Sequence, residues 1–302
     1  MSSKTPILAD EASIARTTSW GDYALVDSGG GRKLERYGPY HMVRPEPQCL
    51  WTPRLDPVRW DEAEAVFDPT DEDEAGHWRF RDQPRDTWPL KWRDVAFKAR
   101  FTSFRHLAFF PEQAANWAWL HDRAAASPGM RVLNLFGYTG VASLVCAAAG
   151  AAVTHVDASK RSVGWARENA ELSRLSDRPI RWLCEDARRY VQREARRGAQ
   201  YEGIILDPPK YGRGPGGEVW RLFEDLPELM KLCGQILSDH ASFVLVNAYA
   251  ARISGLALAH LLAEQTRGRG GRIEWGELAL QEDGGGREIG LSFFARWTDG
   301  RQ

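Results

Sequence analysis

Val132-Leu-Asn-Leu-Phe-Gly-Tyr-Thr-Gly140 decides the fold. It predicts a short apolar strand at 131–134, a glycine turn, and a helix that begins at Gly140. Further apolar strands are expected at 152–156, 180–184, 203–206 and 242–246, with helices from Lys160 and Asp186 between them. Continuous apolar strands separated by helices are typical of a parallel sheet covered on both faces. The sequence therefore predicts a doubly wound, Rossmann-like α/β sheet.

The C-terminal part of the chain departs from this alternation. Strands are expected at 272–280 and 289–297, and the residues between them include Gly284, Gly285 and Gly286. This connection is too short for a crossover helix, so the two strands must be antiparallel. We expect an antiparallel hairpin to complete the sheet.

The first hundred residues show a different pattern, in which tryptophans, prolines and charges are interleaved without a helical period. A strand pair is expected around the glycines at 29–31, and the acidic stretch 61–74 is expected to be a solvated loop. We expect a small β-rich domain over residues 1–103 and the α/β domain over residues 104–302.

Composition excludes several classes of protein. The 302 residues are 43% hydrophobic and 27% charged, with a formal net charge of -1. No apolar run approaches the ~20 residues that span a bilayer, and the N-terminus lacks the apolar centre of a secretory signal. The cysteines Cys49, Cys146, Cys184 and Cys233 form no Cys-x-x-Cys pair, which argues against a zinc knuckle or a disulfide framework. We expect a cytoplasmic protein with reduced thiols, the last three of them in the core.

Ligand-binding chemistry is expected where the first two strands end. Gly137 and Gly140 follow the first strand, and Asp157 follows the second at the spacing where an acid can take a ribose hydroxyl. The turn lacks the three-glycine dinucleotide fingerprint and the lysine of a P-loop. An adenosine without phosphates fits best, and S-adenosylmethionine (SAM) is such a ligand. The structural alternative is a tight turn with Asp157 in a helix cap.

The next two strands also end in acids. Asp186 follows the third strand, where it can accept a hydrogen bond from an adenine amine. The fourth strand leads into Asp207-Pro-Pro-Lys-Tyr211. Prolines fix φ, so this loop is stiff, and its carboxylate and carbonyls can accept hydrogen bonds from a nucleobase edge. Tyr211 is suited to stacking on a base.

These segments resemble the class I SAM-dependent methyltransferases, and specifically the ribosomal RNA large-subunit methyltransferase group, which includes 5-methylcytosine and 7-methylguanine enzymes. The resemblance covers about 104–246. Within it, Phe109-Phe-Pro-Glu-Gln113 is similar to the group's segment that helps enclose SAM.

The resemblance implies roles for individual residues. The methionine part of SAM would be surrounded by Asn134, Phe136, Gly137, Thr139 and Gly140. Asp157 and Ala158 would hold the ribose and adenine, and Asp186 and Ala187 would meet the adenine edge. Asp207 and Pro208 would line the transfer site. Asn169 would support the turn from within its helix. No metal is expected. The expected catalytic residues are Asp207, Pro208, Pro209 and Tyr211, and the expected cofactor-binding residues are Phe109, Phe110, Gln113, Asn134, Phe136, Gly137, Tyr138, Thr139, Gly140, Asp157, Ala158, Ser159, Asn169, Asp186, Ala187 and Asp207.

The absence of a cysteine after the fifth strand indicates which substrate atom accepts the methyl group. Methylation of cytosine carbon needs attack by a cysteine thiolate, which in this group follows the fifth strand. Here that strand ends Val246-Asn-Ala-Tyr249. We therefore expect methylation of a nucleobase nitrogen, with ribosomal RNA as the partner and Arg213 beside the site.

Other functions stay open at this stage. The sequence is also consistent with a methyltransferase for protein or a small molecule, and with a non-catalytic RNA-binding module that retains SAM. A nicotinamide-dependent oxidoreductase would share the sheet and Asp157, but it should carry the three-glycine fingerprint.

Overall fold

A computed structural model describes residues 5–70, 75–82, 84–249 and 252–300. By its contacts the chain divides into two units. The α/β unit comprises Met1–Ala15, Asn116–Leu278 and Leu291–Gln302, and the β-rich unit comprises Arg16–Ala115 and Ala279–Gly290.

The α/β unit is built on one sheet with the strand order β1-β17-β18-β16-β13-β10-β11-β12, and β2 also pairs with β17. The neighbours from β12 to β16 are parallel, and β18 runs antiparallel to β16. The predicted doubly wound sheet and its C-terminal hairpin are both confirmed. The strands are β1 (Ile7–Leu8), β2 (Ser13–Thr17), β10 (Arg131–Leu135), β11 (Ala152–Asp157), β12 (Ile180–Cys184), β13 (Gly203–Leu206), β16 (Phe243–Tyr249), β17 (Arg272–Gln281) and β18 (Glu288–Thr298).

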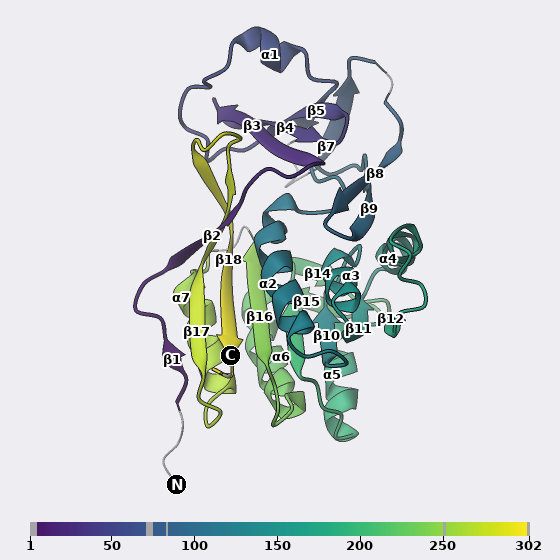
Figure 1. Cartoon of the computed structure of the whole chain (residues 1–302), viewed down its shortest axis with the longest axis vertical. Coiled ribbons are helices and arrows are strands. Elements are labelled where there is room, and N and C mark those ends of the chain that lie inside the picture. The colour runs from purple at the N-terminus through teal and green to yellow at the C-terminus, as the bar shows by residue number, and fades with distance from the viewer. Residues whose placement is uncertain (1–4, 71–74, 83, 250–251, 301–302) are drawn as a thin grey trace. The chain divides into compact units, whose positions relative to one another are not determined.

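Helices cover both faces of this sheet. In Figure 1, α2 and α3 lie in front of the strands and α5, α6 and α7 behind them. One continuous core joins Leu133, Ile204 and Val244 on the strands to Leu229 and Leu258 on the helices behind. The apolar strands of the sequence are therefore buried between two helical layers. The helices are α2 (Ala114–Ala125), α3 (Val141–Ala148), α4 (Lys160–Leu172), α5 (Ala187–Arg196), α6 (Leu222–Ile236) and α7 (Gly255–Gln265).

The β-rich unit contains a sheet with the order β3-β4-β5-β6-β7 and a separate pair, β8 with β9. The strand pair expected around the glycines at 29–31 is β3 and β4. The prediction of a loop at 61–74 is wrong over Ala65–Pro69, because these residues form β6 with Ala65 and Phe67 buried. Residues 71–74 lie outside the described part of the chain. The elements are β3 (Tyr23–Gly29), β4 (Arg32–Tyr37), β5 (Tyr40–Pro45), α1 (Pro57–Asp61), β6 (Ala65–Pro69), β7 (Gly76–Phe80), β8 (Thr87–Trp92), β9 (Val95–Arg100) and the 3-10 turn η1 (Pro111–Gln113).

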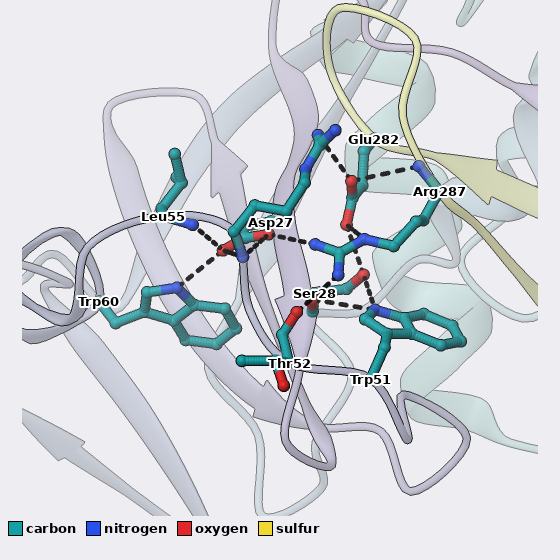
Figure 2. A network of polar contacts seen from close by, with 9 residues as sticks. Asp27, Ser28, Trp51, Thr52, Leu55, Trp60, Glu282 and Arg287 are labelled. Atoms are coloured by element: carbon teal, nitrogen blue, oxygen red, sulfur yellow. Dashed lines mark hydrogen bonds and ion pairs between the residues drawn. The ribbon is translucent and has the colours of Figure 1, made fainter.

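A buried polar network attaches the distant segment Ala279–Gly290 to the β-rich unit (Figure 2). Arg287 bridges Asp27 at 2.8 Å and Glu282 at 3.0 Å, and both carboxylates are fully buried. Asp27 also accepts hydrogen bonds from the N–H groups of Arg54 and Leu55. The ion pair between Arg287 and Asp27 thus attaches this segment to a strand that is far away in the sequence.

The contact units differ from the expected division at residue 103. Residues 5–15 supply β1 and part of β2 to the α/β unit, and 104–115 belong to the β-rich unit. Pairing between strands far apart in sequence causes this difference. That residues 1–103 act as a domain of their own stays a prediction. Within the described residues, no helix is both long and apolar enough to cross a membrane.

Candidate active site

The turn after β10 is closed by its own backbone. The Gly137 N–H donates to the Val156 carbonyl at 3.1 Å, and the Gly140 N–H donates to the Gly137 carbonyl at 2.9 Å. Phe136, Tyr138 and Gly140 have positive φ values of 57°, 48° and 82°. A Cβ at Gly137 would lie 2.4 Å from the His155 ring, so this position has no room for a side chain.

Asp157, at the end of β11, ties this turn to the next helix. Its Oδ2 accepts from the Tyr138 N–H at 2.9 Å and its Oδ1 from the Ser159 N–H at 2.8 Å. Burial raises the pKa of Asp157 although these two hydrogen bonds favour the charged form. Each carboxylate oxygen can accept a further hydrogen bond. The cap of α4 is Ser159, whose hydroxyl accepts from the Ser162 N–H, so Asp157 is not the cap itself.

Buried polar side chains support the turn from beneath. The Asn134 amide donates to the Ser143 hydroxyl at 2.8 Å, and that hydroxyl lies 3.0 Å from His155 Nδ1. The Asn169 amide donates to the Thr139 carbonyl at 2.9 Å, so this side chain contacts the turn from within α4. Ser143 and His155 were missed at the sequence level, because nothing in an apolar strand and helix marks which polar residues meet in three dimensions.

We expect His155 to make the stability of this unit depend on pH. Burial lowers its pKa to about 3, and among the described residues its Nε2 has no hydrogen-bond partner. The unfolded chain takes up this proton below about pH 6.5 while the folded chain does not, so stability is complete above pH 6.5 and falls with the pH. At pH 5 we expect a loss of about 2 kcal/mol in the free energy of unfolding.

Urea unfolding of the full chain between pH 7 and pH 5 measures this effect. His155→Asn should flatten the pH dependence, whereas His240→Asn, at an exposed histidine, should retain it. An unchanged slope in His155→Asn would mean that other groups cause the loss.

The end of β12 carries Asp186, which caps α5 by accepting from the Arg189 N–H at 2.9 Å. Ala187 is buried behind it. Cys184 is exposed, and its thiol lies 3.5 Å from the Ala158 carbonyl oxygen. The expectation that Cys184 is a core residue is wrong, because β12 is the edge strand of the sheet.

The Asp-Pro-Pro loop follows the central strand β13, at the carboxyl ends of the parallel strands. Pro208 is buried, and the Pro209 carbonyl accepts from the Trp220 indole at 2.7 Å. The Trp220 ring also packs on Phe136, with the ring centroids 4.8 Å apart. Tyr211 begins the hairpin of β14 (Tyr211–Arg213) and β15 (Val219–Arg221) and is 51% exposed. Trp220, missed at the sequence level, thus fixes this loop against the glycine turn.

The expected residues Phe109, Phe110 and Gln113 belong to the β-rich unit, and Asn247, on the fifth strand, which no cysteine follows, belongs to the core. Phe109 packs on Tyr37 and Phe97 in the β-rich unit, and Gln113 is buried there in η1, after Phe110. Asn247, on β16, is buried and accepts from the Asn116 amide at 3.0 Å.

Three carboxylates therefore lie where parallel strands of this sheet end: Asp157 ends β11, Asp186 follows β12 and Asp207 follows β13. Their negative charge disfavours a pyrophosphate and suits a ligand that carries hydroxyl and amine donors and a positive charge. SAM has these groups, so the three carboxylates fit SAM better than a nicotinamide dinucleotide.

Comparison with known proteins supports the same conclusion. A family model described as "S-adenosylmethionine-dependent methyltransferase" matches residues 66–249. It begins inside the β-rich unit, so the likeness extends further toward the N-terminus than residue 104. The crystal structure of a SAM-dependent methyltransferase from Agrobacterium tumefaciens is 46% identical, with a TM-score of 0.94 over 99% of this chain and 97% of that one.

Curated relatives match a shorter region. Proteins named ribosomal RNA large subunit methyltransferase K/L are 32% identical over 127 residues in Syntrophotalea carbinolica and 36% identical over 124 residues in a Shewanella species. These matches cover 41% and 40% of this chain, but only 17% of each relative. The family model covers more than half of the chain and agrees with the observed sheet. The chain belongs to the S-adenosylmethionine-dependent methyltransferases and is an enzyme of that family.

Proposed function

We propose that this enzyme methylates a nitrogen atom of a nucleobase in ribosomal RNA, without a cysteine nucleophile. The observation that carries the proposal is the stiff loop after β13, where the Asp207 carboxylate is followed by two prolines and the exposed ring of Tyr211. An acidic group and an aromatic face suit a planar base with N–H donors. The ribosomal RNA methyltransferases among the relatives support RNA as the acceptor, and such a substrate would put the reaction in the cytoplasm.

The positions of the thiols support nitrogen rather than carbon. Cys49, Cys146 and Cys233 are buried, which leaves Cys184 as the exposed thiol of the described chain. It ends β12, three strand intervals from β13, so roughly 14 Å separate the two strands at about 4.8 Å per interval. Covalent attack on a cytosine ring beside Asp207 needs a thiolate in contact with that ring.

The cofactor would be held by the acidic strand ends. We propose that Asp157 binds the ribose hydroxyls and that Asp186 with Ala187 meets the adenine. The turn from Phe136 to Gly140, supported by Asn134 and Asn169, would surround the methionine part. Bound SAM supplies an electrophilic methyl group on a sulfonium. Further contacts with SAM remain predicted at Phe109, Phe110, Gln113, Ala158 and Ser159.

The acceptor nitrogen already has a lone pair and needs orientation in line with the methyl–sulfur bond. We propose that Asp207 and the Pro208 carbonyl accept hydrogen bonds from the base and that Tyr211 stacks on it. Trp220 supports this role because its indole holds the Pro209 carbonyl. The protein residues thus act by positioning.

Transfer of a labelled methyl group tests the proposal. The full chain is incubated with labelled SAM and, separately, with total RNA, total protein and a small-molecule extract, with Asp207→Ala as the control. We expect label in RNA, absent with the variant, and a methylated ring or exocyclic nitrogen after digestion to nucleosides. Label confined to protein or metabolites would refute RNA as acceptor, and 5-methylcytosine would refute nitrogen. SAM binding without transfer to any of the three would favour a non-catalytic RNA-binding module.

A further inference from the structure

The β-rich unit contains a pocket of about 420 Å³ that none of the expected site residues lines. It is lined by Val43 and Val66 on the sheet and by Trp60 on α1, which belong to one hydrophobic cluster. The rim carries Arg32 and Arg81. The volume is near the lower end of the ~300–1,000 Å³ range of small-molecule sites, which suits one nucleotide and excludes a duplex.

Two guanidinium groups at this rim have no acidic partner within the described residues. Arg32 is exposed and lies over the Trp60 ring at 5.4 Å, and Arg81 donates to the Glu62 main-chain carbonyl at 3.3 Å. Arg79, also on the rim, differs because Asp68 pairs with it at 3.1 Å. Arg32 and Arg81 therefore keep their charge available for an anion, and a guanidinium fork matches a phosphate.

The pocket also offers an aromatic face and an acceptor. Phe80 is 40% exposed, whereas Trp60 is nearly buried and its indole is fixed by a 3.1 Å hydrogen bond to Asp27. Asp61 lines the pocket, where its carboxylate can accept from a base amine or ring N–H. Phosphate-binding groups, a stacking face and a hydrogen-bond acceptor occur together, which is the combination that recognises an unpaired nucleotide.

We propose that this pocket binds a single unpaired nucleotide of the RNA substrate, with the base on Phe80 and the flanking phosphates on Arg32 and Arg81. The inference rests on the proposed function, because it takes the acceptor to be RNA. It assigns the β-rich unit a substrate-binding role of its own. Single-stranded RNA fits this site better than a helix, since double-stranded RNA is bound by shape across its minor groove.

Fluorescence anisotropy with the full chain tests the pocket. The probes are a labelled 12-nucleotide single-stranded RNA of mixed sequence and a 12-base-pair RNA duplex, with an unlabelled nucleoside monophosphate as competitor. The variants are Arg32→Ala/Arg81→Ala, Phe80→Ala and, as the matched control, Arg85→Ala, an exposed arginine of the same unit that does not line the pocket. Thermal unfolding verifies that each variant is folded.

We expect Arg32→Ala/Arg81→Ala to raise Kd for the single strand at least tenfold and to reduce the slope of log affinity against log salt by about 1.4, because two phosphate contacts are lost. Phe80→Ala should raise Kd by about 5-fold or more without changing that slope, since stacking is not ionic. Arg85→Ala should bind within twofold of the unsubstituted protein.

Several results would overturn the inference. Unchanged Kd values in both pocket variants, or equal loss in Arg85→Ala, would exclude the pocket as the RNA site. Displacement of the RNA by the monophosphate at equal affinity would identify a free-nucleotide site instead. If the unsubstituted protein transfers methyl groups to RNA and the variants keep its KM, only this inference fails. If it neither binds nor methylates RNA, the proposed function fails as well.

Discussion

Asp207→Ala is expected to lower kcat for methyl transfer by about 100- to 1,000-fold while changing SAM affinity by less than about threefold, in line with loss of one well-placed polar group at a reacting centre. The carboxylate follows β13 in a loop in which the Trp220 indole donates to the Pro209 carbonyl at 2.7 Å. The two prolines and this hydrogen bond restrict the backbone of the loop, and orientation is the main contribution expected of this enzyme. Single-turnover transfer and equilibrium SAM binding measure the two quantities separately.

Asp186→Ala is the matched control, because it removes the same charge at the carboxyl end of another parallel strand of the sheet, β12. The Asp186 carboxylate accepts from the Arg189 N–H at 2.9 Å at the start of α5, and we propose that it meets the adenine of SAM. This variant should therefore weaken SAM binding and leave transfer from the SAM-saturated enzyme nearly intact. Asp207→Asn should recover part of the activity, since its amide oxygen still accepts. If Asp207→Ala lost SAM binding and transfer equally, Asp207 would be a cofactor ligand and not a residue that positions the acceptor.

The second large effect is expected in the β-rich unit. Asp27→Asn should reduce the free energy of unfolding by about 3–5 kcal/mol, because it removes one partner from a buried ionic network. Two main-chain N–H groups, the Trp60 indole and the Arg287 guanidinium all donate to Asp27 (Figure 2). Burial alone would raise the pKa of Asp27, but these N–H donors outweigh it and the pKa lies below its usual value. An asparagine offers one acceptor oxygen where the site presents four donors.

Hydrogen exchange of peptides from residues 23–60 measures the local loss directly, and urea unfolding gives the total. Asp68→Asn is the control, since its ion pair with Arg79 is partly exposed and should contribute less than about 1 kcal/mol. A loss no larger in Asp27→Asn than in Asp68→Asn would show that the network of Arg287 and Glu282 does not hold the unit together.

Much of the α/β unit was predictable because its signals are local. Each strand is a short apolar run, and each is followed by a turn or cap residue that ends it, as Gly140 and Ser159 do before α3 and α4. The placement of acids after neighbouring strands was predictable for the same reason, since parallel strands present their carboxyl ends at one edge. The β-rich unit was less accessible: β6 follows an acidic stretch, and only pairing with β5 and β7 makes it a strand.

By itself the sequence determined the parallel sheet, its C-terminal hairpin, and the acids and glycines that end the strands, because apolar runs, glycine turns and proline loops act on their own neighbours. The tertiary structure alone decided which distant side chains meet. It brought Ser143 to His155, Trp220 to Pro209, and Arg287 to Asp27. It also gathered Arg32, Phe80 and Arg81 around one pocket. Such contacts depend on how strands pair and helices pack across the whole chain, and no short stretch of residues encodes that.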